Sequence, residues 1–260
     1  MLNATTKDHA PVNGINMYYE IYGAGVMPLV LIHGGGSTIE STFGAILPLF
    51  ATNNKVIAVE LQAHGRTSDR DAPESFEQDA DDVAGLLKYL QIEKANFFGF
   101  SNGGTTTLQI ALRHSQLVNK IVVVSSNYKR DGMLPGLLEG MKGATLNDMP
   151  MALQEAYLKV TPDRDGLQNM FNKDKARMLN FKDMSDDELQ RITTPTLLIV
   201  GDRDVVTVEH VVKMAHLIPE ARLTVLPGTH GSFIGEVGTA IPDSKLPGLT
   251  VALTEEFLRG

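Results

Sequence analysis

Short runs of apolar residues recur along the chain, and each run stops at a glycine-rich or polar loop. Runs of this kind, rich in β-branched residues, are typical of parallel strands that are buried on both faces of a sheet. The chain therefore predicts a mostly parallel sheet of the α/β class. The runs lie at residues 28–32, 55–60, 96–100, 121–124, 196–200 and 223–226.

Helical patterns fill most of the intervals between these runs. Val83, Leu86, Leu87 and Leu90 recur at i, i+3, i+4 and i+7, which places them on one face of a helix that spans about 75–90. The alternation of strands and helices predicts a sheet with helices on both faces. An antiparallel hairpin is expected around Gly14 at the edge of the sheet. Further helices are expected at about 102–114, 208–215 and 248–258.

Residues 127–191 differ in texture from the segments around them. They contain no strand-like run, helix-forming residues dominate, and glycine and proline divide them into pieces. We therefore expect several short helices inserted into a sheet domain that is formed by residues 1–126 and 192–260. Methionine, which suits an adaptable apolar wall, is concentrated in this insert. Its methionines are Met133, Met141, Met149, Met151, Met170, Met178 and Met184.

The composition argues against several classes of function. The chain of 260 residues carries a net charge of −8 and has no cysteine. A mildly acidic surface repels phosphate backbones, so nucleic acid is not the expected partner. The lack of cysteine excludes disulfide frameworks, thiolate nucleophiles and cysteine metal sites.

The sequence also gives an expectation about location. No apolar run approaches the ~20 residues that are needed to span a bilayer, so no association with a membrane is expected. The first residues, MLNATTKDHAPVNG, lack the basic and then apolar segments of a signal peptide. We therefore expect a cytoplasmic protein, although a trimmed amino-terminus would read the same way and leaves export open.

The segment Gly99-Phe100-Ser101-Asn102-Gly103 joins a predicted strand directly to a predicted helix. Such a sharp turn forces the serine into a strained, positive-φ conformation and requires small neighbours. It also lifts the hydroxyl above the carboxyl edge of the sheet, where ligands bind in open α/β folds. The other interpretation is a purely structural turn in which Ser101 caps the helix.

A serine nucleophile needs a base within reach of a hydrogen bond, and the base needs a carboxylate to orient it. His230 follows the last predicted strand, and Asp202 and Asp204 follow the strand before it. All these side chains are therefore expected at the same edge of the sheet as Ser101, in the chain order Ser, Asp, His. We expect no metal at the two aspartates, because a hard cation needs six or more oxygen ligands and no others cluster nearby.

Five motifs together make the chain resemble the α/β-hydrolase-fold serine hydrolases over essentially its whole length. They are LIHGGGS at 31–37, AHGRTS at 63–68, GFSNGG at 99–104, PTLLIVGDRDVVT at 195–207 and PGTHGSF at 227–233. The resemblance implies a mostly parallel sheet of eight strands and a helical cap formed by the insert. The chain departs from the family at Glu60-Leu61-Gln62-Ala63-His64-Gly65, where relatives often have an acidic residue, any residue and then Arg-Gly-His-Gly.

The resemblance also implies roles for individual residues. Ser101 would be the nucleophile and His230 the general base and then the general acid. Asp204, at the fourth position of the family pattern Gly-x-x-Asp, would be the triad carboxylate, with Asp202 as the less favoured choice. The backbone N–H groups of Asn102 and Gly35 would form the oxyanion hole.

Other residues near these motifs receive lesser roles. Gly36 is the alternative second donor to the oxyanion hole. Gly34, Gly36 and Phe100 are expected to contact the substrate, whereas His33 and His64 are expected to brace their loops through hydrogen bonds.

These observations predict a hydrolase without metal or cofactor that acts on a small, fairly apolar carboxylic ester or lactone through an acyl-enzyme. Carbon–carbon bond hydrolases of diketone-like compounds and cofactor-free perhydrolases share the triad and stay open as alternatives. A small-molecule sensor built on the same fold is an alternative of another class. The expected partner is a small-molecule substrate, and the sequence gives no indication of the oligomeric state.

Overall fold

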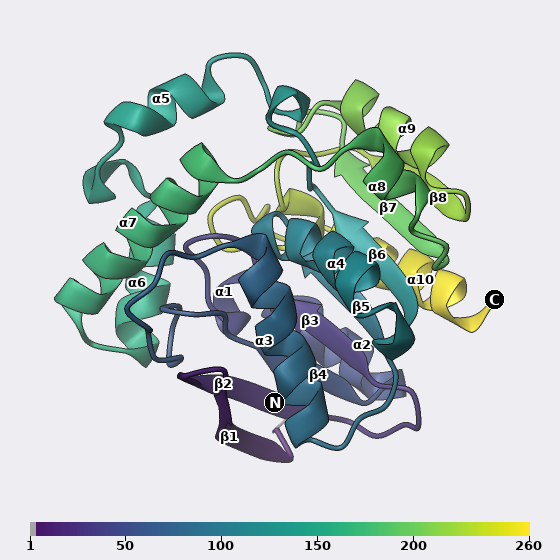
Figure 1. The fold of residues 1–260 in the computed structure, drawn as a ribbon, viewed down its shortest axis with the longest axis horizontal. Coiled ribbons are helices and arrows are strands. Elements are labelled where there is room, and N and C mark those ends of the chain that lie inside the picture. Colours follow the sequence, from purple (N-terminus) through teal and green to yellow (C-terminus); the bar gives the residue numbers. More distant parts are fainter. Residues whose placement is uncertain (1–3) are drawn as a thin grey trace.

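An eight-stranded sheet forms the centre of the computed structural model, which describes residues 4–260 (Figure 1). The strand order is β1-β2-β4-β3-β5-β6-β7-β8; β1 and β2 form an antiparallel hairpin, β2 pairs antiparallel with β4, and the other pairs are parallel. The predicted α/β class and mostly parallel sheet are confirmed. The strands are β1 Thr6–Val12, β2 Ile15–Tyr22, β3 Leu29–Ile32, β4 Val56–Val59, β5 Ala95–Phe100, β6 Val118–Val124, β7 Thr196–Gly201 and β8 Ala221–Leu226. Residues 1–3, part of the predicted first segment, lie outside the described residues.

Helices cover both faces of the sheet, as predicted. Successive side chains of a strand point to opposite faces, and in β3 Val30 and Ile32 pack in one core cluster while Leu29 and Leu31 pack in another. Residues of α3, α4 and α9 complete the first cluster, and residues of α1, α2 and α10 complete the second. The helices are α1 Ile39–Phe43, α2 Leu47–Asn53, α3 Phe76–Tyr89, α4 Asn102–Arg113, α5 Leu137–Gly143, α6 Met151–Val160, α7 Arg164–Asn180, α8 Asp186–Gln190, α9 Val208–Leu217 and α10 Leu246–Arg259.

The helices α1 and α2 were not predicted, because neither is long enough to show a helical period. α1 begins with a capping box, in which Thr38 and Ser41 each accept a hydrogen bond from the other's backbone N–H. Across residues 4–260, every helix is too short or too polar to cross a membrane.

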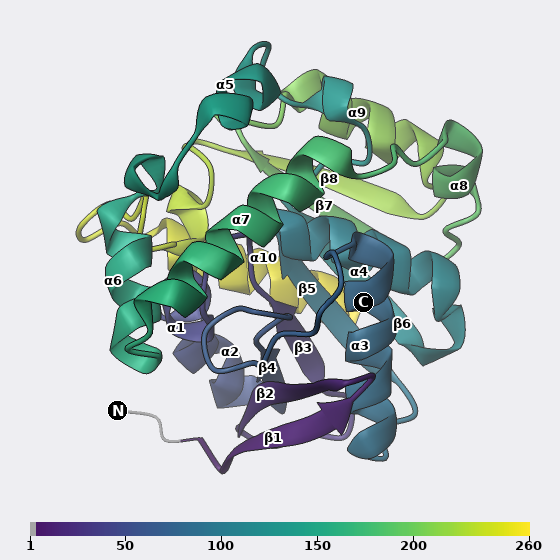
Figure 2. The same cartoon turned by 60° about the vertical axis from the view of Figure 1, so that its left-hand side comes forward.

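The helices between β6 and β7 separate into two groups. α5, α6 and α7 stand together beyond the carboxyl ends of the strands, outside the layer formed by α3 and α4 (Figures 1 and 2). Met149, Tyr157, Leu167 and Met170 form a small apolar cluster within this group. α8, which belongs to the same predicted insert 127–191, packs instead against α9 of the sheet domain. The carboxyl-terminal end of that insert is therefore part of the main core.

Gly103, in the first turn of α4, packs so closely against the end of β3 that it tolerates no side chain. A Cβ added there would lie 2.2 Å from the carbonyl oxygen of Ile32 and 2.5 Å from that of His33. We expect Gly103→Ala to lower the free energy of unfolding by about 3 kcal/mol, measured by urea denaturation, because β3 and α4 would have to move apart. Gly248→Ala in α10 is the control, since its Cβ would meet nothing within 4 Å, and its effect should stay within about 1 kcal/mol. Equal stabilities of the two variants would contradict this account.

Candidate active site

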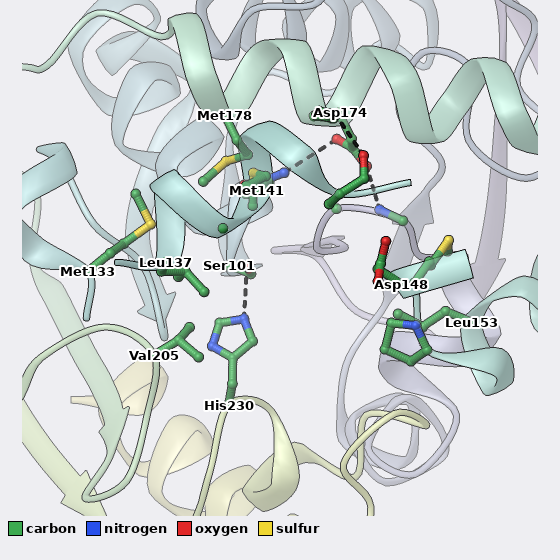
Figure 3. Close-up of a pocket in the computed structure, with 18 of the residues that line it drawn as sticks. Ser101, Met133, Leu137, Met141, Asp148, Leu153, Asp174, Met178, Val205 and His230 are labelled. Carbon is green, nitrogen blue, oxygen red and sulfur yellow. Dashed lines mark hydrogen bonds between the residues drawn. The ribbon is translucent and has the colours of Figure 1, made fainter. Parts of the chain in front are cut away.

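The loops that follow β3, β5, β6, β7 and β8 meet at the carboxyl edge of the sheet, beneath α5 and α7 (Figure 3). This edge is where open α/β sheets place their ligands. The sequence-predicted residues Ser101, Asp204 and His230 all lie here and form one chain of hydrogen bonds.

Ser101 is the single residue that connects β5 to α4. Its backbone has φ 54° and ψ −120°, a strained conformation for a residue that is not glycine. The hydroxyl does not cap α4; instead its Oγ lies 3.0 Å from Nε2 of His230. The interpretation in which the Ser101 side chain caps α4 is therefore wrong.

His230 is held between the serine and a carboxylate. Its Nδ1 lies 2.7 Å from Oδ1 of Asp204, and because a carboxylate only accepts, Nδ1 donates this bond. With Nδ1 as the donor to Asp204, Nε2 faces the Ser101 hydroxyl as its acceptor. The Phe100 ring packs against the imidazole with 4.8 Å between centroids, and Thr239 Oγ1 donates to the His230 carbonyl oxygen at 2.7 Å.

The side chain of Asp204 is fully buried and richly hydrogen-bonded. Besides His230, it accepts from Ser125 Oγ at 2.5 Å and from the backbone N–H groups of Val206 and Gly201 at 3.2 and 3.3 Å. Burial alone would raise the pKa of Asp204, but the hydrogen bonds from His230, Ser125 and the Val206 N–H lower it below its ordinary value. The carboxylate therefore stays ionised beside His230.

Asp202 has a different place. Its Oδ1 accepts a hydrogen bond of 2.7 Å from the backbone N–H of Gly228, which links the loop after β7 to the loop after β8. Of the two aspartates left open by the sequence, only Asp204 hydrogen-bonds to His230. Asp202 therefore holds these two loops together.

The glycines after β3, together with His33, form a loop of residues 33–36, which we call the oxyanion loop after the role predicted for Gly35. Gly35 and Gly36 line the cavity above Ser101, as does Asn102. The Gly36 N–H already donates to Oδ2 of Asp174 at 2.5 Å. Asn102 is the first residue of α4, so its N–H has no acceptor within the helix.

Two residues that were expected to contact the substrate do not line the cavity. Gly34 packs under Phe100 and Ser101, where a Cβ would lie 3.1–3.2 Å from their side-chain atoms. Phe100 is buried and supports the His230 ring instead. Gly34 and Phe100 were predicted to contact the substrate, but in the fold they support Ser101 and His230.

His33 and His64 hold their loops through hydrogen bonds, as expected, but His33 is neutral and His64 is charged. His33 Nδ1 faces the carbonyl oxygen of Gly34 and Nε2 accepts from the Leu61 N–H, and burial lowers the pKa of this neutral ring to about 3. Both nitrogens of His64 face acceptors, the carbonyl oxygen of Gln62 at 2.8 Å and Oδ2 of Asp174 at 2.9 Å. Burial disfavours its charge, but the Asp174 carboxylate raises the pKa of His64 to about 9, so this ring is an imidazolium.

A cavity of about 660 Å³ lies between Ser101 and the helices α5 and α7 (Figure 3). Its wall is mostly apolar. The charged residues that line it are Asp148, Asp174 and Lys175. Four methionines of the insert are also in the wall, Met133, Met141, Met149 and Met178, whereas Met170 and Met184 are buried elsewhere and Met151 is exposed.

Comparison with known proteins fits this geometry. Residues 27–171 match the family profile that is described as the alpha/beta hydrolase fold. The chain belongs to this family. The match covers more than half of the chain, from β3 to within α7, and it includes Ser101 and the oxyanion loop.

Individual relatives of this α/β hydrolase include enzymes with different names. The serine hydrolase BPHL of Homo sapiens is 27% identical over 216 residues, which cover 77% of this chain and 71% of that protein. Est816, described as an N-acyl homoserine lactone degrading enzyme, is 26% identical and superposes with a TM-score of 0.72 over 96% of this chain and 99% of its own. The meta-cleavage product hydrolase of Pseudomonas fluorescens IP01 is 22% identical with a TM-score of 0.79, covering 98% of both chains, and shares the fold.

Three residues of the site in this α/β hydrolase were not predicted from the sequence. Ser125 follows β6 with φ 50°, and a polar residue at the carboxyl end of a buried strand was the available signal. Asp174 and Arg177 lie on α7 and form an ion pair beside the cavity. Their i, i+3 spacing is common on exposed helices, so it gave no sign of a place in the site.

Proposed function

We propose that this α/β hydrolase is a serine hydrolase that cleaves small, mostly apolar carboxylic esters or lactones through an acyl-enzyme. The observation that carries the proposal is the chain of hydrogen bonds from Ser101 through His230 to Asp204 at the floor of an apolar cavity. Each member has an orientation that suits its role in this chemistry.

In the proposed reaction, Ser101 Oγ bonds to the carbonyl carbon while its proton passes to Nε2 of His230. Asp204 stabilises the resulting imidazolium. The tetrahedral intermediate then expels the alcohol oxygen, which takes the proton from Nε2 as the C–O bond breaks. Water attacks the acyl-enzyme, gives one proton to His230, and releases the carboxylic acid as Ser101 recovers its proton.

The backbone N–H groups of Gly35 and Asn102 are proposed to bind the oxyanion. Gly35 and Gly36 are the two candidates for the donor from the oxyanion loop. We choose Gly35, because the Gly36 N–H already donates to the Asp174 carboxylate. The Asn102 N–H lies at the positive end of the α4 dipole, which adds to the stabilisation of a negative charge.

The charges in the wall favour a neutral substrate. Asp148 already accepts from Thr145, and Asp174 is paired with His64 and Arg177. Lys175 is the only lysine or arginine among the residues that line the cavity, and its Nζ donates to the Ala144 carbonyl oxygen at 2.7 Å. A substrate carboxylate would therefore meet a single lysine, offset by Asp148, and no cluster of basic side chains that could bind it. The names of BPHL and Est816, a serine hydrolase and a lactone-degrading enzyme, agree with the proposed reaction and substrate class.

A substrate panel tests the proposal. It comprises p-nitrophenyl acetate, butyrate and octanoate, N-acyl homoserine lactones of several chain lengths, and an anionic 2-hydroxy-6-oxo-dienoate. Neutral esters or lactones should be turned over with a kcat/KM at least about 10-fold higher than the dienoate. Turnover of the dienoate alone would favour a carbon–carbon bond hydrolase, and a single burst without steady-state turnover would favour a sensor.

A further inference from the structure

Asp174 brings a carboxylate from α7 down to the oxyanion loop. Its Oδ2 accepts from the Gly36 N–H at 2.5 Å and from Nε2 of His64 at 2.9 Å. Its Oδ1 accepts from Arg177 and lies 3.4 Å from the side-chain nitrogen of Asn102. Figure 3 shows the dashed bonds that run from this carboxylate toward the residues around Ser101. One carboxylate thus contacts Gly36, beside one proposed oxyanion donor, and Asn102, which carries the other.

The carboxylate is itself held by buried charges. Arg177, one turn further along α7, donates to Asp174 and also to Oδ2 of Asp79 on α3 at 2.5 Å. Burial alone would raise the pKa of Asp174, but the charges of His64 and Arg177 keep it well below its usual range. The two residues of α7 are therefore tied to the sheet domain at two points, the oxyanion loop and α3.

The oxyanion loop needs such a support because glycine leaves its backbone free. Three consecutive glycines have few conformational restraints of their own, and Gly36 has φ +67°. A hydrogen bond to the Gly36 N–H fixes the peptide plane between Gly35 and Gly36, and so restricts how the Gly35 N–H can point. Donors to an oxyanion act only when they are aligned before the charge develops.

We propose that Asp174 is a positioning residue that aligns the oxyanion loop from the inserted helices, so that α7 contributes to the rate as well as to the shape of the cavity. The proposal rests on the proposed serine-hydrolase function. Asp174 does not touch the reacting atoms; it acts through Gly36 and Asn102.

The kinetic test compares variants of the whole chain. Asp174→Ala should lower kcat for the best ester about 10–100-fold with a change of KM below about 3-fold, because misaligning a donor costs at most what its removal costs, about 10²–10³. Asp174→Asn keeps an oxygen that can accept from Gly36 and should recover part of the loss. Asp79→Asn is the matched control, since it weakens the buried ion pair between Arg177 and α3 but removes none of the bonds from Asp174 to Gly36, Asn102 and Arg177, and its kcat should stay within about 3-fold of the wild type.

A tetrahedral mimic gives a second readout. The serine hydroxyl adds to the carbonyl carbon of a trifluoromethyl ketone and gives an adduct with an oxyanion. The matching methyl ketone forms this adduct to a far smaller extent. The affinity for the trifluoromethyl ketone should fall in Asp174→Ala by the same factor as kcat, while the affinity for the methyl ketone stays constant. A loss of kcat in Asp79→Asn equal to that in Asp174→Ala would overturn the proposal and leave Asp79, Asp174 and Arg177 with a structural role only.

Hydrogen exchange separates this proposal from the proposed function. Peptides that contain residues 33–36 should exchange faster in Asp174→Ala and Asp174→Asn than in Asp79→Asn, with or without catalysis. Faster exchange in a chain whose wild type hydrolyses nothing would refute the function and retain the positioning role. Unchanged exchange in both Asp174 variants would refute the positioning role even if esters are hydrolysed.

Discussion

Ser101→Ala is expected to lower kcat/KM for the best ester or lactone by at least about 10⁴-fold. The variant lacks the oxygen that would bond to the carbonyl carbon, and what remains is the slow attack of water assisted by the oxyanion hole. The measurement is steady-state kinetics, together with the intact mass after treatment with a fluorophosphonate. The wild type should gain the mass of one adduct and the variant none.

Ser115→Ala is the control for this experiment. Ser115 is an exposed serine at the start of the 3₁₀ turn that follows α4 in the chain. Its replacement should leave both activity and labelling unchanged. If Ser101→Ala retains the activity of the wild type while its urea midpoint is also unchanged, hydrolysis occurs elsewhere in the molecule and the proposed site is wrong.

Asp204→Asn should cost about 10⁴-fold in kcat, while Asp202→Asn should stay within about 3-fold of the wild type. Losing the carboxylate removes the charge that stabilises the imidazolium and allows His230 to take the unproductive tautomer. Asp202 accepts only a backbone hydrogen bond from Gly228, which the amide oxygen of asparagine can also accept. Kinetics of the two variants under identical conditions make the comparison, and equal losses would show that the assignment of Asp204 fails.

The positions of Ser101 and His230 could be predicted because their signals are local. A strand, a serine between small residues and a helix occupy one short segment, and the strands that precede Ser101 and His230 end at the same edge of a parallel sheet. The choice between Asp202 and Asp204 needed the resemblance to a family, since both follow β7 within four residues. The structure brings Asp204 alone to the histidine.

The role of Asp174 could not be predicted, for a physical reason. Asp174 and Gly36 are separated by 138 positions along the chain, and their contact depends on how α7 packs over the sheet domain. No period or spacing in the sequence encodes that packing. The places of Gly34 and Phe100 also depend on packing. Both lie near Ser101, as predicted, but they pack behind Ser101 and His230 and do not line the cavity.

The thioether groups in the cavity wall bear on the alternative of a perhydrolase. Such an enzyme releases a peracid next to its own binding surface, and oxidants of this kind convert methionine into the polar sulfoxide. The wall residues Met133, Met141, Met149 and Met178 would meet each product molecule as it leaves. A cavity built in this way would turn hydrophilic through its own turnover, so it is chemically compatible with carboxylic acids and alcohols as products and ill-suited to the repeated release of peracids.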